Sequence, residues 1–325
     1  MYPRASVPEV LDFGSPKASF RDDLLRGLQQ RPKSIPSKYF YDERGAELFE
    51  RICKTPEYYP TRTELEITRV HAEEMAECLG DRCLLVEYGS GASLKSRILL
   101  DHLDEPAGYV PIDISREQLE RTATVLHGLY PRLEVLPVCA DYTGDYALPT
   151  PARPARHVSV YFPGSTIGNF TRPQAASFLE HVAEISGEGG GLLLGVDLQK
   201  DRETLESAYN DAAGVTEAFN KNLLVRANRE LGTDFRPDDF RHVAFYDEDE
   251  GRIEMHLESV RDQTVRIAER QVSLSAGERI HTENSYKYRL GPFADLAQGA
   301  GWSVVACWTD PERLFSVQYL EVNPA

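Results

Sequence analysis

Polar side chains that could bind a ligand follow apolar runs at intervals along the chain. Glu87, Asp113 and Asp141 end three such runs, and Asn169 lies in the loop after a fourth. A carboxylate at the position of Asp113 commonly accepts hydrogen bonds from a ribose diol. Asp141-Tyr142 could accept a hydrogen bond from an adenine amino group and stack on its ring. Asn169 offers one acceptor and two donors, which suits it to orienting an amine without protonating it.

The run Leu84-Leu85-Val86-Glu87-Tyr88-Gly89-Ser90-Gly91 predicts a buried strand followed by a tight turn. Gly89 and Gly91 leave room for a ligand, and glycine adopts positive φ without cost. Dinucleotide folds carry a third glycine, which is missing here, so the pattern favours S-adenosylmethionine over NAD. Lys95 could contact the carboxylate of that cofactor. The predicted cofactor residues are Glu87, Gly89, Ser90, Gly91, Lys95, Asp113, Asp141 and Tyr142. A turn without a ligand, loop aspartates and a solvated lysine remain the alternative readings.

The order of elements predicts a parallel sheet. Strands are expected at 84–88, 108–113, 133–139, 157–162 and 192–197, and they alternate with helices at 62–79, 93–103, 115–129 and 172–186. Such alternation is typical of βαβ units, whose ligands bind beyond the carboxyl ends of the strands. After 197 the chain changes to one or two helices over 201–231 and short alternating strands over 240–285. A helix at 291–300 and strands at 302–308 and 314–322 then fit the closing pair of a seven-stranded sheet.

These elements predict an α/β fold, a seven-stranded Rossmann-like sheet of the class I methyltransferase type with a second α+β lobe that binds the substrate. The core is expected to comprise residues 62–198 and 286–325, and the substrate lobe residues 1–61 and 199–285.

Composition narrows the class of protein. The chain has 325 residues, a formal net charge of −16, 27% charged and 41% hydrophobic residues, which is typical of a globular protein. The negative charge disfavours a nucleic-acid partner. No apolar run approaches the roughly 18 residues of a membrane span, and the first residues lack a signal region, so we expect a cytoplasmic protein without a membrane partner. The five cysteines form no C-x-x-C pair and the histidines show no metal-binding spacing, so we expect no metal.

Two further clusters could bind a substrate. Tyr58 and Tyr59 lie in a proline-flanked loop, and Glu283 and Ser285 share one side if their segment is extended. A glutamate and a serine side by side can accept from and donate to the two nitrogens of a neutral imidazole. An exposed strand edge is the alternative interpretation of the second cluster.

The chain resembles a known family from about residue 37 to its end. Matching segments are Lys38-Tyr39-Phe40-Tyr41-Asp42, Leu48-Phe49-Glu50, Pro56-Glu57-Tyr58-Tyr59-Pro60-Thr61-Arg62-Thr63-Glu64, Gly89-Ser90-Gly91-Ala92-Ser93, Phe162-Pro163-Gly164-Ser165-Thr166-Ile167-Gly168-Asn169-Phe170 and Glu283-Asn284-Ser285. They are similar to the stand-alone, S-adenosylmethionine-dependent histidine Nα-methyltransferases that make hercynine for ergothioneine biosynthesis.

The resemblance implies roles for individual residues. Gly89, Lys95, Asp113, Asp141 and Tyr142 would hold the cofactor, with Tyr142 where the family often has phenylalanine. Asn169, Tyr58 and Tyr59 would form the catalytic set. The substrate-binding residues would be Tyr41, Tyr58, Tyr59, Gly164, Asn169, Tyr209, Met255, Glu283 and Ser285. Within that set tyrosines would hold the carboxylate, and which of Tyr58 and Tyr59 does so stays open. Asn169 would orient the α-amine. Glu283, Ser285 and Met255 would surround the imidazole.

The resemblance also implies the reaction. Three methyl groups pass in succession from S-adenosylmethionine to the α-nitrogen of L-histidine, and S-adenosylhomocysteine is released each time. We expect a monomer whose only partner is this small molecule. Two alternatives remain: a methyltransferase of the same fold for another aromatic amino acid such as tryptophan, and a non-catalytic S-adenosylmethionine-binding regulatory module.

Overall fold

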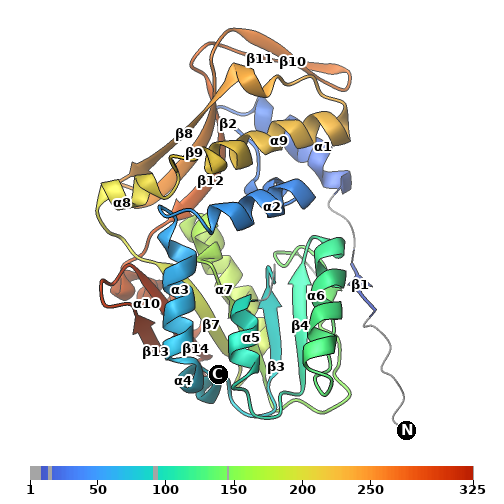
Figure 1. The fold of residues 1–325 in the computed structure, drawn as a ribbon, viewed down its shortest axis with the longest axis vertical. Coiled ribbons are helices and arrows are strands. Elements are labelled where there is room, and N and C mark those ends of the chain that lie inside the picture. The colour runs from blue at the N-terminus through green and yellow to red at the C-terminus, as the bar shows by residue number, and fades with distance from the viewer. Residues whose placement is uncertain (1–8, 14–16, 91–93, 145, 325) are drawn as a thin grey trace. The chain divides into compact units, whose positions relative to one another are not determined.

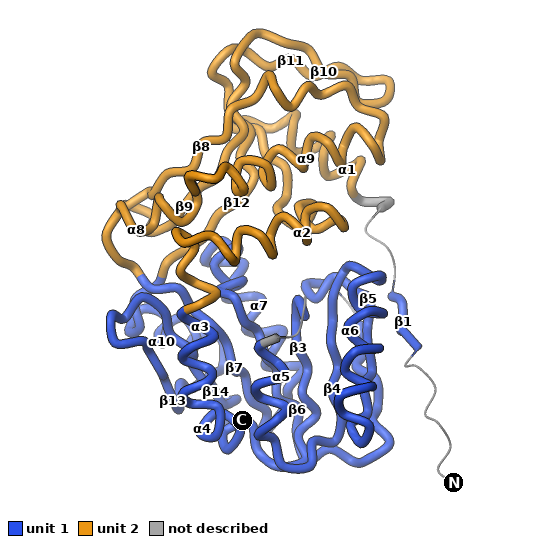
Figure 2. The backbone as a smooth tube through the Cα atoms, in the orientation of Figure 1, with its two compact units in different colours: residues 1–15, 63–198, 288–325 blue, residues 16–62, 199–287 orange. Residues whose placement is uncertain are grey.

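The computed structural model describes residues 9–13, 17–90, 94–144 and 146–324. The chain divides into two compact units, which Figure 2 colours separately. Unit 1 comprises residues 1–15, 63–198 and 288–325, and unit 2 comprises residues 16–62 and 199–287. Each unit therefore consists of segments that are far apart in the sequence.

Unit 1 is built on a mixed sheet in the order β1-β5-β4-β3-β6-β7-β14-β13 (Figure 1). Its strands are β1 (Leu11–Asp12), β3 (Leu84–Tyr88), β4 (Gly108–Asp113), β5 (Val138–Cys139), β6 (Val158–Phe162), β7 (Gly191–Asp197), β13 (Trp302–Thr309) and β14 (Phe315–Val322). Pairs from β1 to β7 are parallel, whereas β14 runs antiparallel to β7 and β13 antiparallel to β14. The predicted class of fold is confirmed, and the two strands expected to close the sheet are β13 and β14.

The edge of this sheet differs from the prediction in two ways. The strand expected at 133–139 is reduced to β5 and an isolated bridge between Val135 and Tyr109, because Pro111 of β4 has no N–H to donate to Leu136 O. In addition, β1 pairs with β5, so the described sheet has one strand more than the predicted seven. Residues Leu11–Asp12, which the sequence places in the substrate lobe, lie in unit 1 instead. A two-residue strand held through backbone bonds, such as Leu11 N to Pro137 O at 3.0 Å, has no detectable side-chain periodicity.

Helices cover both faces of the sheet of unit 1. They are α3 (Tyr59–Val70), which begins in unit 2, α4 (Ala72–Leu79), α5 (Leu94–Leu100), α6 (Arg116–Leu129), α7 (Arg172–Ser186) and α10 (Leu290–Gly299). Residues of α3 to α6 form one apolar cluster with Leu85, Tyr161 and Leu193. On the opposite face of the sheet, Phe178 of α7 packs against Tyr88 of β3 and Phe162 of β6. Successive residues of a strand point to opposite faces, so Tyr88 and Phe162 point away from Leu85 and Tyr161. Strands β3 and β7 are consequently buried along their whole length.

Unit 2 combines a four-stranded sheet in the order β2-β12-β9-β8 with a hairpin and helices. Its elements are α1 (Lys17–Gln29), β2 (Lys33–Ser34), η1 (Ser37–Phe40), α2 (Glu43–Ile52), α8 (Arg202–Ser207), α9 (Val215–Leu231), η3 (Pro237–Asp239), β8 (Phe240–Asp247), β9 (Arg252–Ser259), β10 (Gln263–Ile267), β11 (Arg270–Leu274) and β12 (Arg279–Tyr286). Glu283 pairs with Met255, and Ser285 with Ile253, across β12 and β9. Directly opposed residues share a face, so Glu283, Ser285 and Met255 lie on one side of this sheet.

Candidate active site

The turn after β3 has the conformation that its glycines predict. Gly89 has φ of +68°, and its N–H donates to Ile112 O at 2.8 Å. A Cβ added at Gly89 would meet nothing within 4 Å, so the conformation, and not a lack of space, requires glycine. Ser90 is buried. Gly91, also predicted to bind cofactor, lies outside the described residues.

Glu87 points into the layer between the sheet and α5. Its carboxyl accepts hydrogen bonds from the hydroxyls of Ser96 and Tyr109, and burial raises its pKa to about 7. These contacts join β3, β4 and α5 below the turn. The predicted cofactor contact of Glu87 stays a prediction.

Two acceptors and an aromatic ring lie together beyond β4 and β5. Ala140 N donates to Asp113 O at 3.1 Å, which holds the two strand ends side by side. Asp113 accepts from Ser115 N at 2.9 Å and Asp141 from Thr143 N at 3.1 Å. The ring of Tyr142 stacks on Tyr88, with centroids 5.3 Å apart and planes 21° apart. Burial raises the pKa of Tyr142, so its phenol stays protonated.

Lys95 forms an ion pair with Glu64, which lies in a family-like motif but had no predicted role. Glu64 is 0% exposed, and its two carboxylate oxygens lie 2.9 and 3.0 Å from the Gly164 N–H that donates to them. A Cβ at Gly195 of β7 would lie 2.2 Å from Glu64 Oε1, so this strand needs glycine there. Glu64 thus ties the loop after β6 to Lys95 of α5.

The loop after β6 is held in an unusual backbone conformation. Gly164 and Ser165 have φ of +80° and +55°. Asp197 N donates to Ser165 Oγ at 2.9 Å, and Thr166 Oγ1 donates to Pro163 O at 2.8 Å. The short helix η2 (Thr166–Asn169) follows, and it leaves Asn169 partly exposed at its end. A non-glycine residue at positive φ costs energy, and such strain is typical of functional loops.

In unit 2 the predicted tyrosines lie in different surroundings. The rings of Tyr58 and Tyr209 meet edge to face at 6.1 Å, and both are buried. Burial, and to a lesser extent Tyr209, raises the pKa of Tyr58, which therefore stays a neutral phenol. Tyr41 packs on Phe49 at 5.7 Å, and Phe49 on Tyr58 at 6.2 Å.

Tyr59 contacts a lysine instead. The Nζ of Lys200 lies 4.3 Å from the centroid of the Tyr59 ring and donates to its hydroxyl. The role of each tyrosine toward a substrate stays a prediction, as does the choice between the two.

Glu283 is a buried carboxyl group without a hydrogen-bond partner among the described residues. It is 8% exposed, and burial raises its pKa to about 8, an effect that the charge of Lys287 opposes. Ser285 Oγ lies 2.8 Å from Tyr209 Oη and accepts from Lys287 Nζ at 2.9 Å. Lys287 had no predicted role, although residues 283, 285 and 287 alternate along one strand and the sequence could therefore have placed Lys287 on the same face as Glu283 and Ser285.

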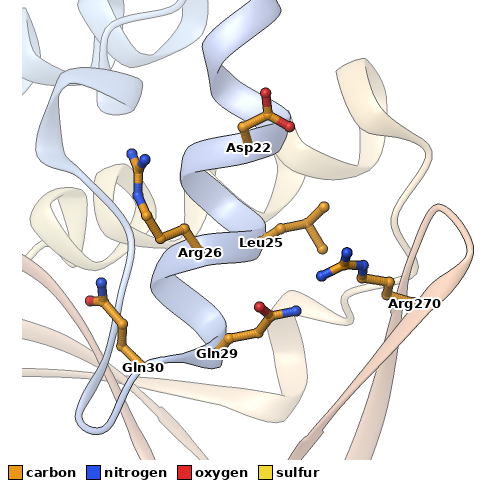
Figure 3. Close-up of a pocket in the computed structure, with 6 residues that line it drawn as sticks. All are labelled: Asp22, Leu25, Arg26, Gln29, Gln30 and Arg270. Atoms are coloured by element: carbon orange, nitrogen blue, oxygen red, sulfur yellow. The ribbon is translucent and has the colours of Figure 1, made fainter.

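One surface hollow lies apart from these residues. A surface hollow of about 320 Å³ in unit 2 is lined by Asp22, Leu25, Arg26, Gln29, Gln30 and Arg270, none of which belongs to the predicted site (Figure 3). Within the described part of the chain, no group of three or more histidine, cysteine or acidic residues could hold a metal ion. The described helices include none that is long and apolar enough to span a bilayer.

The sheet order, the glycine turn after β3 and the antiparallel pair β14-β13 define a class I methyltransferase fold. The fold is similar to that of an S-adenosylmethionine-dependent methyltransferase from Clostridium acetobutylicum, with a TM-score of 0.50 and 8% identity over 86% of this chain and 99% of that one. The sequence model of the histidine-specific, S-adenosylmethionine-dependent methyltransferases matches residues 20–322, and the chain belongs to that family.

Individual relatives agree with this assignment. The chain is 42% identical to the histidine N-alpha-methyltransferase of Mycolicibacterium smegmatis, over 96% of this chain and 98% of that protein. It is 35% identical to ergothioneine biosynthesis protein 1 of Neurospora crassa, over 86% of this chain but only 32% of that longer protein.

The contacts of Glu64 lead to a stability prediction. Glu64→Gln removes the charge that pairs with Lys95, and we expect the free energy of unfolding to fall by about 1–3 kcal/mol. Urea denaturation measures it. Glu66→Gln, an exposed change on the same helix, should alter that free energy by less than about 0.5 kcal/mol. Equal effects of the two changes would contradict a specific role for Glu64.

The raised pKa of Glu283 predicts a pH-dependent stability. Because the native pKa is about 8 and the ordinary value 4.5, the native state holds an extra proton between these limits. The contribution of this proton to the free energy of unfolding is complete below pH 4.5 and is lost as the pH rises through 8. The melting temperature of the wild type relative to Glu283→Gln should therefore fall over that interval, as thermal denaturation at several pH values can measure.

Glu254 on the neighbouring strand supplies a control of opposite sign. Hydrogen bonds from His256, with a further contribution from Arg252, lower its pKa to about 2. Relative to Glu254→Gln, the wild type should lose melting temperature as the pH falls from 4.5 toward 2. If both glutamates gave the same trend, burial of Glu283 would not be the cause.

Proposed function

We propose that this chain transfers three methyl groups from S-adenosylmethionine to the α-amino nitrogen of L-histidine, giving hercynine for ergothioneine biosynthesis. The observation that carries the proposal is the 42% identity, over nearly the full length of both proteins, to a histidine N-alpha-methyltransferase. The proposal includes the expectations that the chain acts as a monomer and in the cytoplasm.

The end of the sheet in unit 1 fits the nucleoside of the cofactor. The space beside Gly89 is open, Asp113 offers an acceptor for the ribose hydroxyls, and Asp141 offers one for the adenine amino group. Tyr142 presents an aromatic ring next to them. When bound, the cofactor supplies an electrophilic methyl group on a sulfonium centre. We assign to these residues the work of holding it in one orientation.

The acceptor nitrogen must have a free lone pair, so the α-amine has to be held unprotonated. We assign this to Asn169, because an amide accepts and donates hydrogen bonds without transferring a proton. The strained loop after β6, held by Glu64 and Ser165, fixes the position of that amide. Alignment of the two reacting atoms at about 3–3.5 Å supplies the main acceleration of such a transfer.

The tyrosines are assigned to the carboxylate of the amino acid. A neutral phenol donates one hydrogen bond to a carboxylate, and burial keeps Tyr58 in that form. Tyr209 lies against Tyr58 and Tyr41 follows along the same aromatic row, so we assign their rings to the same part of the substrate site. Because Tyr58 stays protonated, we assign it to binding and orienting the carboxylate, and not to acting as a base.

The residues assigned to the substrate side chain favour histidine over tryptophan. Glu283 and Ser285 share a face with Met255, and together they can serve both nitrogens of an imidazole. An indole has a single ring N–H and no ring acceptor, so it would leave one of these buried groups unpaired at a cost of about 1–3 kcal/mol. The carboxyl of Glu283 thus favours histidine over the tryptophan alternative.

Mass spectrometry tests the reaction directly. Purified protein with S-adenosylmethionine and each of the twenty amino acids should give products with one, two and three added methyl groups from histidine alone. Hercynine should accumulate at the end of the reaction. Absence of methylated histidine would overturn the proposed function, and binding of the cofactor without any turnover would support the regulatory module.

Glu283→Ala tests how histidine is selected. Loss of a buried hydrogen-bonding group should raise the KM for histidine about tenfold to 100-fold and leave the KM for S-adenosylmethionine within about twofold. Asn284→Ala is the matched control, because Asn284 alternates with Glu283 along β12 and hydrogen-bonds to His281 instead. If Glu283→Ala left both constants unchanged, Glu283 would not bind the imidazole.

A further inference from the structure

Lys287 is a buried cation next to two predicted substrate-binding residues of unit 2, Ser285 and Tyr209. Its side chain is among the largest that are fully buried, at 2% exposure. The backbone N–H of Lys287 donates to Gly251 O at 2.8 Å, and its backbone carbonyl accepts from Gln199 Nε2 at 3.2 Å. The backbone is therefore held by hydrogen bonds at both groups. Burying a lysine restricts a flexible side chain and removes its charge from water, and such a residue is retained where it has a definite task.

The ammonium group of Lys287 contacts two hydroxyls of the predicted site. Its Nζ lies 2.9 Å from Ser285 Oγ and 3.0 Å from Tyr209 Oη. The same Nζ lies 4.9 Å from the centroid of the Tyr209 ring. An ammonium group has donors only, so both hydroxyl oxygens must accept from it.

This one-way donation limits the hydrogen bonds that the Ser285 hydroxyl can make. Ser285 Oγ has two lone pairs and one proton, and Lys287 occupies one lone pair. The phenol of Tyr209, 2.8 Å away, can donate into the second. The remaining capacity of Ser285 is then its own proton, which makes the hydroxyl a donor toward a ligand.

We propose that Lys287 is a specificity-determining positioning residue, which holds the Ser285 hydroxyl as a donor and so selects a substrate ring with an unprotonated nitrogen. The inference rests on the proposed function, because it takes the imidazole of histidine as the ring. Glu283, on the same face as Ser285, accepts from the N–H of that ring. Burial raises the pKa of Glu283 and the charge of Lys287 opposes that rise, and in either protonation state the carboxyl keeps an oxygen that can accept. Donor and acceptor together match one neutral imidazole tautomer.

The test is a double-mutant cycle between Lys287 and Ser285, with binding of L-histidine measured by calorimetry in the presence of S-adenosylhomocysteine. Lys287→Met keeps an unbranched apolar side chain and removes every donor. It should raise the Kd for histidine about tenfold, the loss expected for one hydrogen bond, and leave the Kd for S-adenosylhomocysteine within about twofold. In the Ser285→Ala background the same change should raise the Kd for histidine less than about twofold.

Lys33→Met is the matched control. Lys33 is also a lysine at 2% exposure, on β2 of the same sheet, but it pairs with Glu278. Its replacement should leave both Kd values within about twofold, even if the melting temperature falls. If Lys287→Met does not fold, as a lost melting transition would show, Lys287→Gln retains an NH2 group that can donate to Ser285, without the charge. It should give a smaller rise, about threefold, with the same dependence on Ser285.

Two results would overturn the inference. One is a Kd for histidine that Lys287→Met leaves unchanged, and the other is a rise of equal size with and without the Ser285 hydroxyl. The proposed function fails separately: a wild type that binds histidine but transfers no methyl group would contradict the function, whereas the Lys287–Ser285 coupling would still be measurable.

Discussion

Burial of the central parallel strands on both faces is the constraint on which unit 1 depends. Strands β3 and β7 are buried throughout, so most of their residues are apolar, the buried Glu87 is hydrogen-bonded, and their backbone groups pair within the sheet. Parallel strands also end at the same edge. The polar residues that follow them, among them Asp113 and Asp141, are therefore gathered there whatever their separation in the sequence.

Three buried carboxyl groups show how the same physical penalty is met in different ways. Glu64 is compensated by Lys95 and by the N–H of Gly164, and in this way it secures a loop. Glu87 accepts from two hydroxyls and has a pKa of about 7. Glu283 has no hydrogen-bond partner among the described residues and a pKa of about 8. Buried polar groups without a hydrogen-bond partner are rare in native proteins. The proposed histidine substrate would supply a donor for Glu283.

Much of the fold could be predicted because its signals are local. The helix α7 begins after Thr171, whose hydroxyl and Gln174 form a capping box, and the alternation over Arg252–Ser259 indicates β9. β1 and the shortening of β5 were missed, since a two-residue strand carries no period and the break depends on one proline. Glu64 and Lys287 received no role, because their partners are decided by contacts between segments distant in the chain: Lys95 for Glu64, and Tyr209 for Lys287.

By itself the sequence determined the class of fold, the glycine turn and the residue types available for chemistry, because apolar periodicity, glycine conformation and hydrogen-bonding capacity are properties of short segments. The tertiary structure alone decided which of those groups are buried and what each one faces. Burial raises the pKa of Glu283, the ammonium of Lys287 donates to the Ser285 hydroxyl, and the Glu64–Lys95 pair anchors the loop that carries Asn169. These effects depend on distances of a few ångströms between residues far apart in the chain, and no local pattern encodes them.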